Sequence, residues 1–329
     1  MRTSPIDMNH SRFSASGSAS EAASGPSDFF ALFSALRAAG EVMTRKNERS
    51  ELLDGWSLDV RDPSVLARMM PLMRWFYDYY YRVRTGGWEH IPAGEPVMFV
   101  GSHNGGLPAP DMHMLLYDWC DRFGTEKPLY GLMSPKIWDV MPPIARVAAE
   151  MGAVQAHPKM ALAALNRQAS IVIYPGCVQD VFRPYHQRHR IYFHNRKGFI
   201  KLAIKKGVPI VPMISYGAHS TFVVLADIYP QMKSLHEWGM PWIFGVDPEA
   251  FPIYLGFPWG LAFGPLPHIP PPLQIHTRIC PPIRFERTGA AALKDSSYVD
   301  ACFRQVKSQM QRSLDELVAS CQSGLSVGP

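Results

Sequence analysis

The chain has 329 residues, of which 47% are hydrophobic and 19% charged, and it carries a formal net charge of +5 with a pI near 8.9. This composition predicts a globular protein with a sizeable core and excludes a largely disordered chain. The basic balance suits an anionic partner such as a phospholipid surface or a CoA-like phosphate. Nucleic acid is disfavoured, because the aromatic residues lie in apolar runs and no zinc-finger or RNA-recognition signature is present.

The cysteines are few, scattered and without a CxxC pair, which favours a reducing, cytoplasmic compartment and argues against a disulfide framework or a zinc site. They are Cys120, Cys177, Cys280, Cys302 and Cys321.

The N-terminal third divides into a tail and a helical region. Residues 1–27 are rich in Ser, Ala and Gly and lack the apolar core of a signal peptide, so we expect a disordered tail there. Residues 28–90 predict amphipathic helices, the first at 28–46. No uninterrupted apolar run reaches eighteen residues, so we expect no ordinary transmembrane helix.

The segment at 64–84 combines Met, Leu, Trp, Phe and Tyr with regularly placed Arg. Aromatic and basic residues together suit a helix lying at a membrane interface. A helix packed on the rest of the protein has the same pattern, and both interpretations stay open. Pro71 is expected to kink or divide this helix.

Residues 97–100 predict a buried strand that delivers His103 into a loop containing Gly105 and Gly106, and Asp111 opens the helix that follows. A neutral imidazole can take a proton from an alcohol, and a carboxylate on the other ring nitrogen improves it as a base. The alternative is a capped helix beside a satisfied loop histidine.

Strands and helices alternate through the centre of the chain, which predicts an α/β fold with a mixed, mostly parallel sheet flanked by helices. Strands are expected at 97–100, 129–132, 170–175 and 208–215, with a closing strand within 273–285, and helices at 110–122, 159–168, 197–206 and 293–320. Residues 228–272 are expected to be mainly loop, and residues 321–329 a tail.

A second loop, at 176–184, also leaves the carboxyl end of a predicted strand. Ligands of open α/β sheets lie outside these strand ends, so this loop and the His103 loop should share a pocket. The N–H groups of Gly176, Cys177 and Val178 are candidates to stabilise an oxyanion. A nucleophilic role for Cys177 is disfavoured, because no elbow of the G-x-S-x-G kind surrounds it.

Residues 182–198 are rich in Arg, Lys and His. Arg183 and Lys197 are the candidates for holding anionic oxygens. The histidines of this stretch come without a Cys or carboxylate cluster, so we expect no metal. His219 is expected to be a packed or surface histidine.

Two motifs carry a resemblance to a known family. SHNGGLPAPD, at 102–111, resembles the His…Asp motif of the PlsC-like glycerolipid acyltransferase superfamily, although seven residues separate His103 from Asp111 where four are usual. IVIYPGCVQDVFR, at 171–183, and the later Arg-Lys-Gly-Phe look like the diacylglycerol and monoacylglycerol acyltransferase branch. That branch has Pro-Gly-Gly-Val-Gln-Glu, where this chain has Cys177 and Asp180.

The resemblance covers roughly residues 90–290 and implies a glycerol-phosphate-acyltransferase-like domain at 91–290, followed by a C-terminal helix and tail at 291–329. It implies an acyltransferase that moves a fatty acyl group from acyl-CoA, or acyl carrier protein, to a lipid hydroxyl without a cofactor. His103 would be the general base, oriented by Asp111. The candidate substrate-binding residues are Asn104, Gly105, Gly106, Pro175, Gly176, Cys177, Val178, Arg183 and Lys197.

The acceptor and the membrane contact follow from the same comparison. Phosphate-using relatives carry Glu-Gly-Thr-Arg after the strand at 171–175, and this chain has Pro-Gly-Cys-Val instead, which favours a neutral acylglycerol or other lipid alcohol. Lysophosphatidate is the alternative, because Arg183 could bind a phosphate. The protein is expected to lie peripherally on the anionic, inner face of a membrane. The apolar run at 257–272 would line an acyl-chain tunnel or touch the bilayer.

Two functions of other classes remain. A lipid hydrolase would use His103 with water or with Ser102, but adjacent residues on a strand point to opposite faces. A non-catalytic lipid-binding protein would explain the widened His103–Asp111 spacing.

Overall fold

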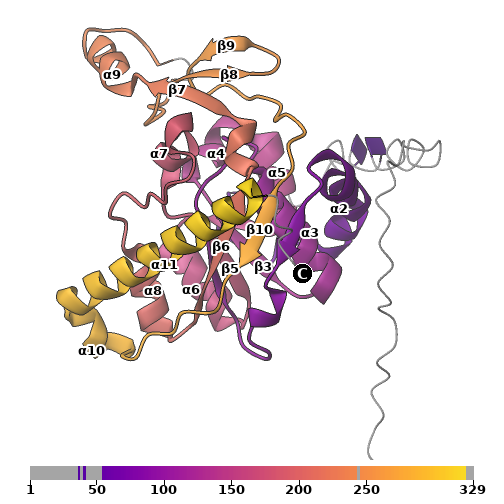
Figure 1. Cartoon of the computed structure of the whole chain (residues 1–329), viewed down its shortest axis with the longest axis vertical. Coiled ribbons are helices and arrows are strands. Elements are labelled where there is room, and N and C mark those ends of the chain that lie inside the picture. Colours follow the sequence, from indigo (N-terminus) through magenta and orange to yellow (C-terminus); the bar gives the residue numbers. More distant parts are fainter. Residues whose placement is uncertain (1–35, 38–39, 42–53, 243–244, 324–329) are drawn as a thin grey trace, which may run out of the picture.

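The computed structural model describes residues 36–37, 40–41, 54–242 and 245–323 (Figure 1). The predicted tail at 1–27 and nearly all of the predicted helix at 28–46 lie outside the described residues, as does most of the predicted C-terminal tail.

A seven-stranded sheet forms the centre of the protein, in the order β1-β10-β6-β2-β5-β3-β4. Its strands are β1 Arg84–Gly86, β2 Met98–Val100, β3 Leu129–Met133, β4 Ala153–Gln155, β5 Ser170–Ile173, β6 Ile210–Tyr216 and β10 His276–Ile279. β10 runs antiparallel to β6, β1 runs parallel to β10, and the other five strands are mutually parallel. The predicted mixed, mostly parallel sheet is therefore confirmed.

The central strands are buried on both faces, so they read as continuous apolar runs. On β2, Met98 and Val100 belong to one core cluster and Phe99 belongs to the other. β5 divides in the same way, with Ile171 and Ile173 on one face and Val172 on the opposite face.

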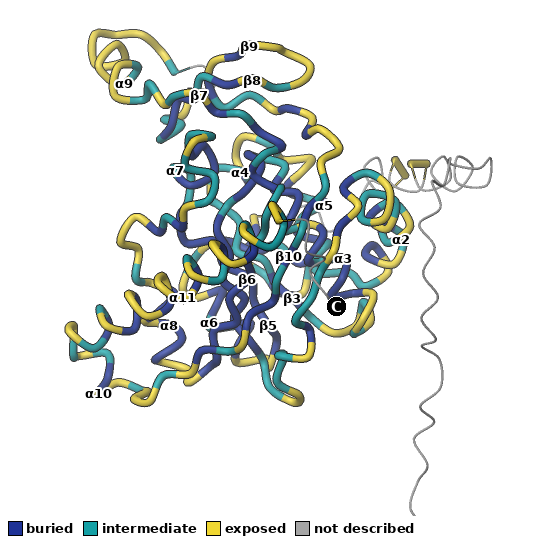
Figure 2. Tube along the Cα trace, viewed as in Figure 1, coloured by how far each residue is buried: buried dark blue, intermediate teal, exposed yellow. Residues whose placement is uncertain are grey.

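Helices cover both faces of the sheet. The helices are α2 Pro63–Trp75, α3 Pro110–Phe123, α4 Pro135–Val140, α5 Pro142–Glu150, α6 Pro158–Asn166, α7 Cys177–Val181, α8 Gly198–Lys206, α9 Tyr229–Glu237, α10 Gly289–Lys294 and α11 Ser296–Gln322. α6, α8 and α11 bury their apolar sides in one cluster, and α2 and α3 bury theirs in clusters on the other face. Figure 2 shows the resulting buried centre.

The segment predicted at 64–84 forms a packed helix. Asp62 caps α2, and Val65, Leu66, Met69 and Met73 are buried against neighbouring elements. The helix runs through Pro71 without being divided and continues into a short π-helix at Phe76–Tyr80. This arrangement matches the second of the two interpretations, a helix packed on the rest of the protein.

The segment at 228–272 departs from the expectation of loop. It contributes α9, β8 Pro252–Gly256 and β9 Gly260–Phe263, and with β7 Val223–Asp227 these strands form a separate antiparallel sheet in the order β7-β8-β9. Figure 1 shows this small sheet and α9 projecting from one end of the main body.

The C-terminal region forms α10 and the longer α11, where one helix was expected. α11 lies along the sheet and packs against β6 and α8. Within the described residues, no helix is both long and apolar enough to span a bilayer.

Candidate active site

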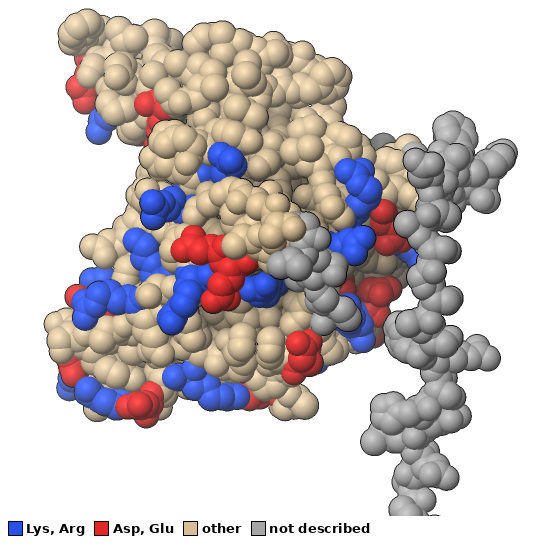
Figure 3. Space-filling view, in the orientation of Figure 1, with Lys and Arg blue, Asp and Glu red and all other residues tan. Residues whose placement is uncertain are grey.

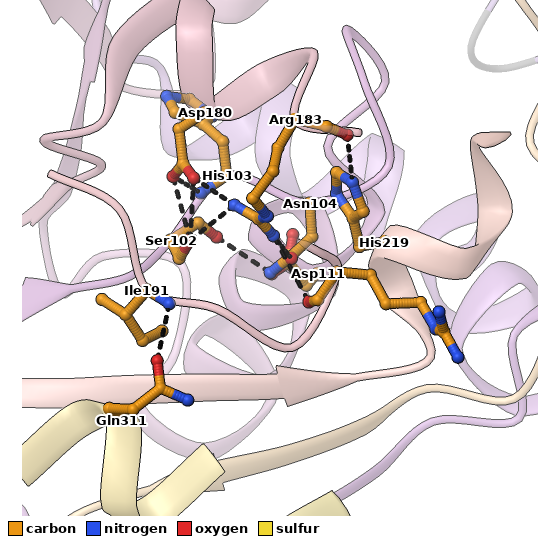
Figure 4. A network of polar contacts seen from close by, with 10 residues as sticks. Ser102, His103, Asn104, Asp111, Asp180, Arg183, Ile191, His219 and Gln311 are labelled. Atoms are coloured by element: carbon orange, nitrogen blue, oxygen red, sulfur yellow. Dashed lines mark hydrogen bonds and ion pairs between the residues drawn. The ribbon is translucent and has the colours of Figure 1, made fainter. Parts of the chain in front are cut away.

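The loops after β2 and β5 meet, as the sequence predicts. The carboxylate of Asp180 accepts a hydrogen bond of 2.7 Å from the backbone N–H of His103, and a second of 2.9 Å from the hydroxyl of Ser102. Because both loops leave the carboxyl ends of parallel strands, residues far apart in the chain converge at one edge of the sheet (Figure 4).

Gly176 makes this convergence possible. A Cβ atom at Gly176 would lie 2.3 Å from Cβ of Asp180, which follows it within α7, so only glycine allows this turn to direct Asp180 toward the His103 loop. Cys177 follows with a φ of 52°, the left-handed region that favours glycine. Its thiol lies near Arg196, and burial raises the pKa of the thiol above its ordinary value, which argues against a thiolate nucleophile.

Arg183 lies inside the site, with its side chain 2% exposed. The guanidinium forms an ion pair with Asp180 and donates to the hydroxyl of Ser102 at 3.1 Å and to the amide oxygen of Asn104 at 3.2 Å. Figure 4 shows it between these groups. From the sequence, Arg183 was predicted to bind anionic oxygens of a substrate. In the structure its guanidinium group instead binds Asp180, Ser102 and Asn104 of the protein itself.

Asn104 joins this network to Asp111. Its amide nitrogen donates to the carboxylate of Asp111 at 2.9 Å and to the backbone carbonyl of Ser102 at 2.8 Å. Asp111 is 1% exposed, and burial raises the pKa of its carboxyl to about 6. The predicted direct bond from Asp111 to His103 is absent from the described contacts, because Asn104 occupies the carboxylate.

The imidazole of His103 is held by packing. Its ring lies 4.8 Å from the ring of Tyr174 between centroids, and its Nδ1 atom is buried without a hydrogen-bond partner in the described part of the chain. Burial, with a smaller contribution from Arg183, lowers the pKa of His103 to about 3. The ring is therefore neutral at physiological pH, as a general base must be.

His219 supports the network from the loop after β6. Its Nε2 atom donates to the backbone carbonyl of Arg183 at 2.9 Å, and burial lowers the pKa of the ring to about 3. The ring is 3% exposed, so His219 is the packed histidine that the sequence suggested.

The basic loop, residues 182–198, runs along the site and is anchored to α11 by hydrogen bonds and an ion pair. The side chain of Gln311 accepts a hydrogen bond from the backbone N–H of Ile191 and donates one to the carbonyl of His189, each at 2.9 Å (Figure 4). Lys197 pairs with Asp300 of α11 at 2.6 Å, so it also binds a residue of the protein. The exposed Arg196 lies beside Cys177 and was not singled out from the sequence.

Ser102 does not contact the imidazole of His103. Its hydroxyl lies between Asp180 and Arg183, so the buried network fixes it, and a direct Ser102–His103 relay is not formed. A small cavity of about 10 Å³ adjoins these groups. It is lined by Ser102, Asn104, Arg183, Arg188, Arg190, Ile191, Met213, Ile214, Ser215 and Leu314.

The described residues include no group of three or more His, Cys, Asp or Glu side chains arranged to hold a metal ion. The histidines of the basic loop point to other partners. The ring of His189 packs on Tyr216, and that of His194 on Tyr192.

Comparison with known proteins identifies the group to which this site belongs. The sequence profile of the diacylglycerol acyltransferase family matches residues 141–306, half of the 329-residue chain. The chain belongs to the diacylglycerol acyltransferase family. As a member of this family it is a lipid acyltransferase, which implies an acyl donor and a lipid acceptor. The resemblance drawn from the two sequence motifs is confirmed.

Relatives of this acyltransferase occur in mycobacteria. An uncharacterized protein of Mycobacterium tuberculosis is 25% identical over 268 residues, covering 81% of this chain and 70% of that protein. One of Mycobacterium leprae is 24% identical over 253 residues, covering 77% and 65%. The crystal structure of the 1-acyl-sn-glycerophosphate acyltransferase PlsC from Thermotoga maritima matches with a TM-score of 0.48 and 14% identity, covering 89% of this chain and 97% of that chain.

The sequence pattern of the family accounts for the backbone conformation of α7. The acylglycerol branch has glycine at the position of Cys177, and the left-handed backbone at Cys177 is the conformation that glycine adopts without strain. The family's glutamate corresponds to Asp180, whose carboxylate holds the backbone of the His103 loop.

Proposed function

We propose that this acyltransferase moves a fatty acyl group from acyl-CoA to the hydroxyl of a neutral acylglycerol or similar lipid alcohol, with His103 as the general base. The observation that carries the proposal is the neutral, half-buried imidazole of His103, in a loop whose backbone is held by Asp180 of the neighbouring loop. Family membership supplies the reaction class.

In this mechanism His103 accepts the hydroxyl proton at Nε2, because Nδ1 is buried. The alkoxide oxygen attacks the thioester carbonyl carbon and forms a tetrahedral intermediate. The carbon–sulfur bond then breaks, the imidazolium returns the proton to the leaving thiolate, and an ester and free CoA are released. The backbone N–H groups at 176–178 are our candidates for stabilising the intermediate's oxyanion.

Asp111 acts in this proposal as a positioning residue. It anchors Asn104, whose amide holds the carbonyl of Ser102 and hence the peptide bond that leads into His103. The seven-residue spacing between His103 and Asp111 is then compatible with activity, because the carboxylate need not touch the imidazole.

The state of Arg183 favours a neutral acceptor. Arg183, the residue that the sequence offered to the phosphate of lysophosphatidate, is buried and paired with Asp180, so that argument for a phosphate acceptor falls away. The exposed Arg196 beside the α7 loop is our candidate for a phosphate of the donor. We place the protein at the inner, cytoplasmic face of a membrane, where both substrates meet.

The test is acyl transfer by the purified full chain, supplied with labelled palmitoyl-CoA or palmitoyl-acyl carrier protein. The acceptors are monoacylglycerol, diacylglycerol, a long-chain alcohol, lysophosphatidate, and water alone. We expect label in a neutral ester with the CoA donor.

Transfer to lysophosphatidate alone would contradict the neutral-acceptor proposal and keep the reaction class. Release of free fatty acid with every acceptor would make the protein a hydrolase. Lipid binding without turnover of either donor would favour the non-catalytic function.

A further inference from the structure

The small β7-β8-β9 sheet has an unusual outer face. Its inward residues, Val224, Tyr254 and Ala262, pack with Phe222 in a buried cluster. The outward residues of the same strands are also apolar, whereas an antiparallel sheet with one free face normally carries polar residues there. They are Val223, Ile253, Leu255, Leu261 and Phe263.

This outer face is exposed within the described structure. Leu255 is 47% exposed, Leu261 55% and Phe263 50%, and the register places Leu255 opposite Leu261 and Ile253 opposite Phe263. The bulge residue Leu225 on β7 is 49% exposed. The side chains therefore form one contiguous apolar surface rather than scattered positions.

The surface also lacks charge. Between Glu249 and Arg278 the sequence contains no Asp, Glu, Lys or Arg. Figure 3 shows an unbroken tan surface over β8 and β9, with blue and red side chains over the main body and near α9. The core of a protein interface is likewise depleted of charge and enriched in aromatic residues, so a second copy of the chain is an outcome of the test below.

Exposed tryptophans occur in the turn of the β8–β9 hairpin and at the end of α9. Trp238, at the end of α9, is 84% exposed, and Trp259, in the turn between β8 and β9, is 52% exposed. Trp is the residue enriched where protein meets the headgroup region of a bilayer. Phe257, in the same turn, is 65% exposed and adds apolar area beside Trp259.

The sheet is joined to the catalytic loop. His268, which follows β9, stacks on Phe222 with ring centroids 4.0 Å apart. A Cβ atom at Gly106 would lie 2.5 Å from the His268 ring, so the loop that carries His103 rests directly against this part of the protein. The segment that follows β9 thus packs against the loop that carries the proposed base, which ties the small sheet to the candidate active site.

We propose that the outer face of β7-β8-β9, with Trp259 in the β8–β9 turn, docks the enzyme on a lipid bilayer by apolar insertion. The proposal rests on the lipid-acyltransferase function argued above for the supply of a lipid acceptor. Insertion of uncharged side chains does not depend on anionic headgroups, so binding persists at high salt.

The test compares the full chain with the triple variant Leu255→Ser/Leu261→Ser/Phe263→Ser. Flotation with phosphatidylcholine vesicles at low and high salt measures binding. We expect the vesicle partition coefficient of the triple variant to fall at least about tenfold, because serine side chains do not gain the free energy that apolar side chains gain on transfer from water to the bilayer. Ile144→Ser is the matched control, since Ile144 is 52% exposed on α5, outside this sheet, and should bind like the parent.

Three outcomes would overturn the docking proposal: a parent that does not float, a triple variant that floats like the parent, or a parent dimer that the triple variant converts to monomer. The last result would assign the face to a second copy of the chain. Acyl transfer to an acceptor in detergent micelles separates the two proposals. A triple variant that is active in micelles and unbound to vesicles supports docking, and a parent inactive in micelles contradicts the proposed function alone.

Discussion

His103 combines two properties that rarely occur together in a loop histidine. Its backbone is fixed by Asp180, while its Nδ1 atom has no hydrogen-bond partner among the described residues. Burial therefore acts on the ring without a carboxylate to oppose it, and the pKa of the imidazole falls to about 3.

This environment predicts the pH dependence of acyl transfer. Once protonated, the imidazole of His103 cannot accept a further proton, so protonation inactivates the base. Because the pKa of His103 is lowered, this inactivation occurs at lower pH than for an ordinary histidine. We expect kcat/KM to show no acid limb centred at 6.5, the ordinary pKa of histidine. A decline that begins near pH 6 would reflect Asp111 and Asp180, because burial raises the pKa of each carboxyl to about 6. An acid limb centred at 6.5 or above would contradict the buried, unpaired ring.

The profile needs a folding control, because other buried groups titrate in the same range. The pKa of His219 is also lowered to about 3, so the unfolded chain takes up its proton first and stability falls as the pH drops below 6.5. Asp111 has the opposite effect, because its raised pKa of about 6 favours the folded state as the pH falls toward 3.8. Circular dichroism at each pH separates unfolding from loss of the base.

At the scale of elements, α7 is the piece that decides whether the site assembles. Gly176, at the start of α7, lies so close to Asp180 in the same turn that the added methyl group of Gly176→Ala would displace the carboxylate and, with it, the His103 backbone. We expect this variant to lose about 1–3 kcal/mol of stability and to lose acyl transfer disproportionately. Urea unfolding and initial rates measure the two effects.

Gly198→Ala is the matched control for α7. No atom lies within 4 Å of an added Cβ at Gly198, which begins α8. Alanine is the better helix former, so this variant should be neutral or more stable by up to about 1 kcal/mol and fully active. Equal losses in both glycine variants would show that packing against Asp180 is not the reason for Gly176.

Elements with a clear apolar pattern were predictable from the sequence. Residues 97–100 and 170–175 read as buried strands because both faces of the central sheet are covered. Gly207, which follows the predicted helix at 197–206, ends α8 with a left-handed φ of 66°, as glycines at helix C-termini do. β8 and β9 were missed because their outer face is apolar as well as their inner face. This removed the alternation that marks a half-exposed strand.

At the scale of the whole molecule, the parallel sheet unites residues that the sequence places far apart. Because both loops leave the carboxyl ends of strands, the sequence predicted that the loops at 102–111 and 176–184 meet, and they do. It could not predict the partners within the site. Arg183 turns inward to Asp180, and Lys197 reaches Asp300, whereas both side chains are long enough to face solvent instead. Tyr174 and Asn104 support the His103 loop through contacts that only the tertiary fold reveals.

The most direct test of the account is ester formation by His103→Ala, measured with palmitoyl-CoA and the neutral acceptor that the panel identifies. His186→Ala is the control, because His186 is an exposed histidine of the basic loop. With circular dichroism showing both variants folded, we predict that His103→Ala loses at least about 10²-fold in kcat, as expected for removal of a general base, and that His186→Ala retains the parent rate. A folded His103→Ala variant that transfers acyl groups at the parent rate would contradict the assignment of His103 as the base.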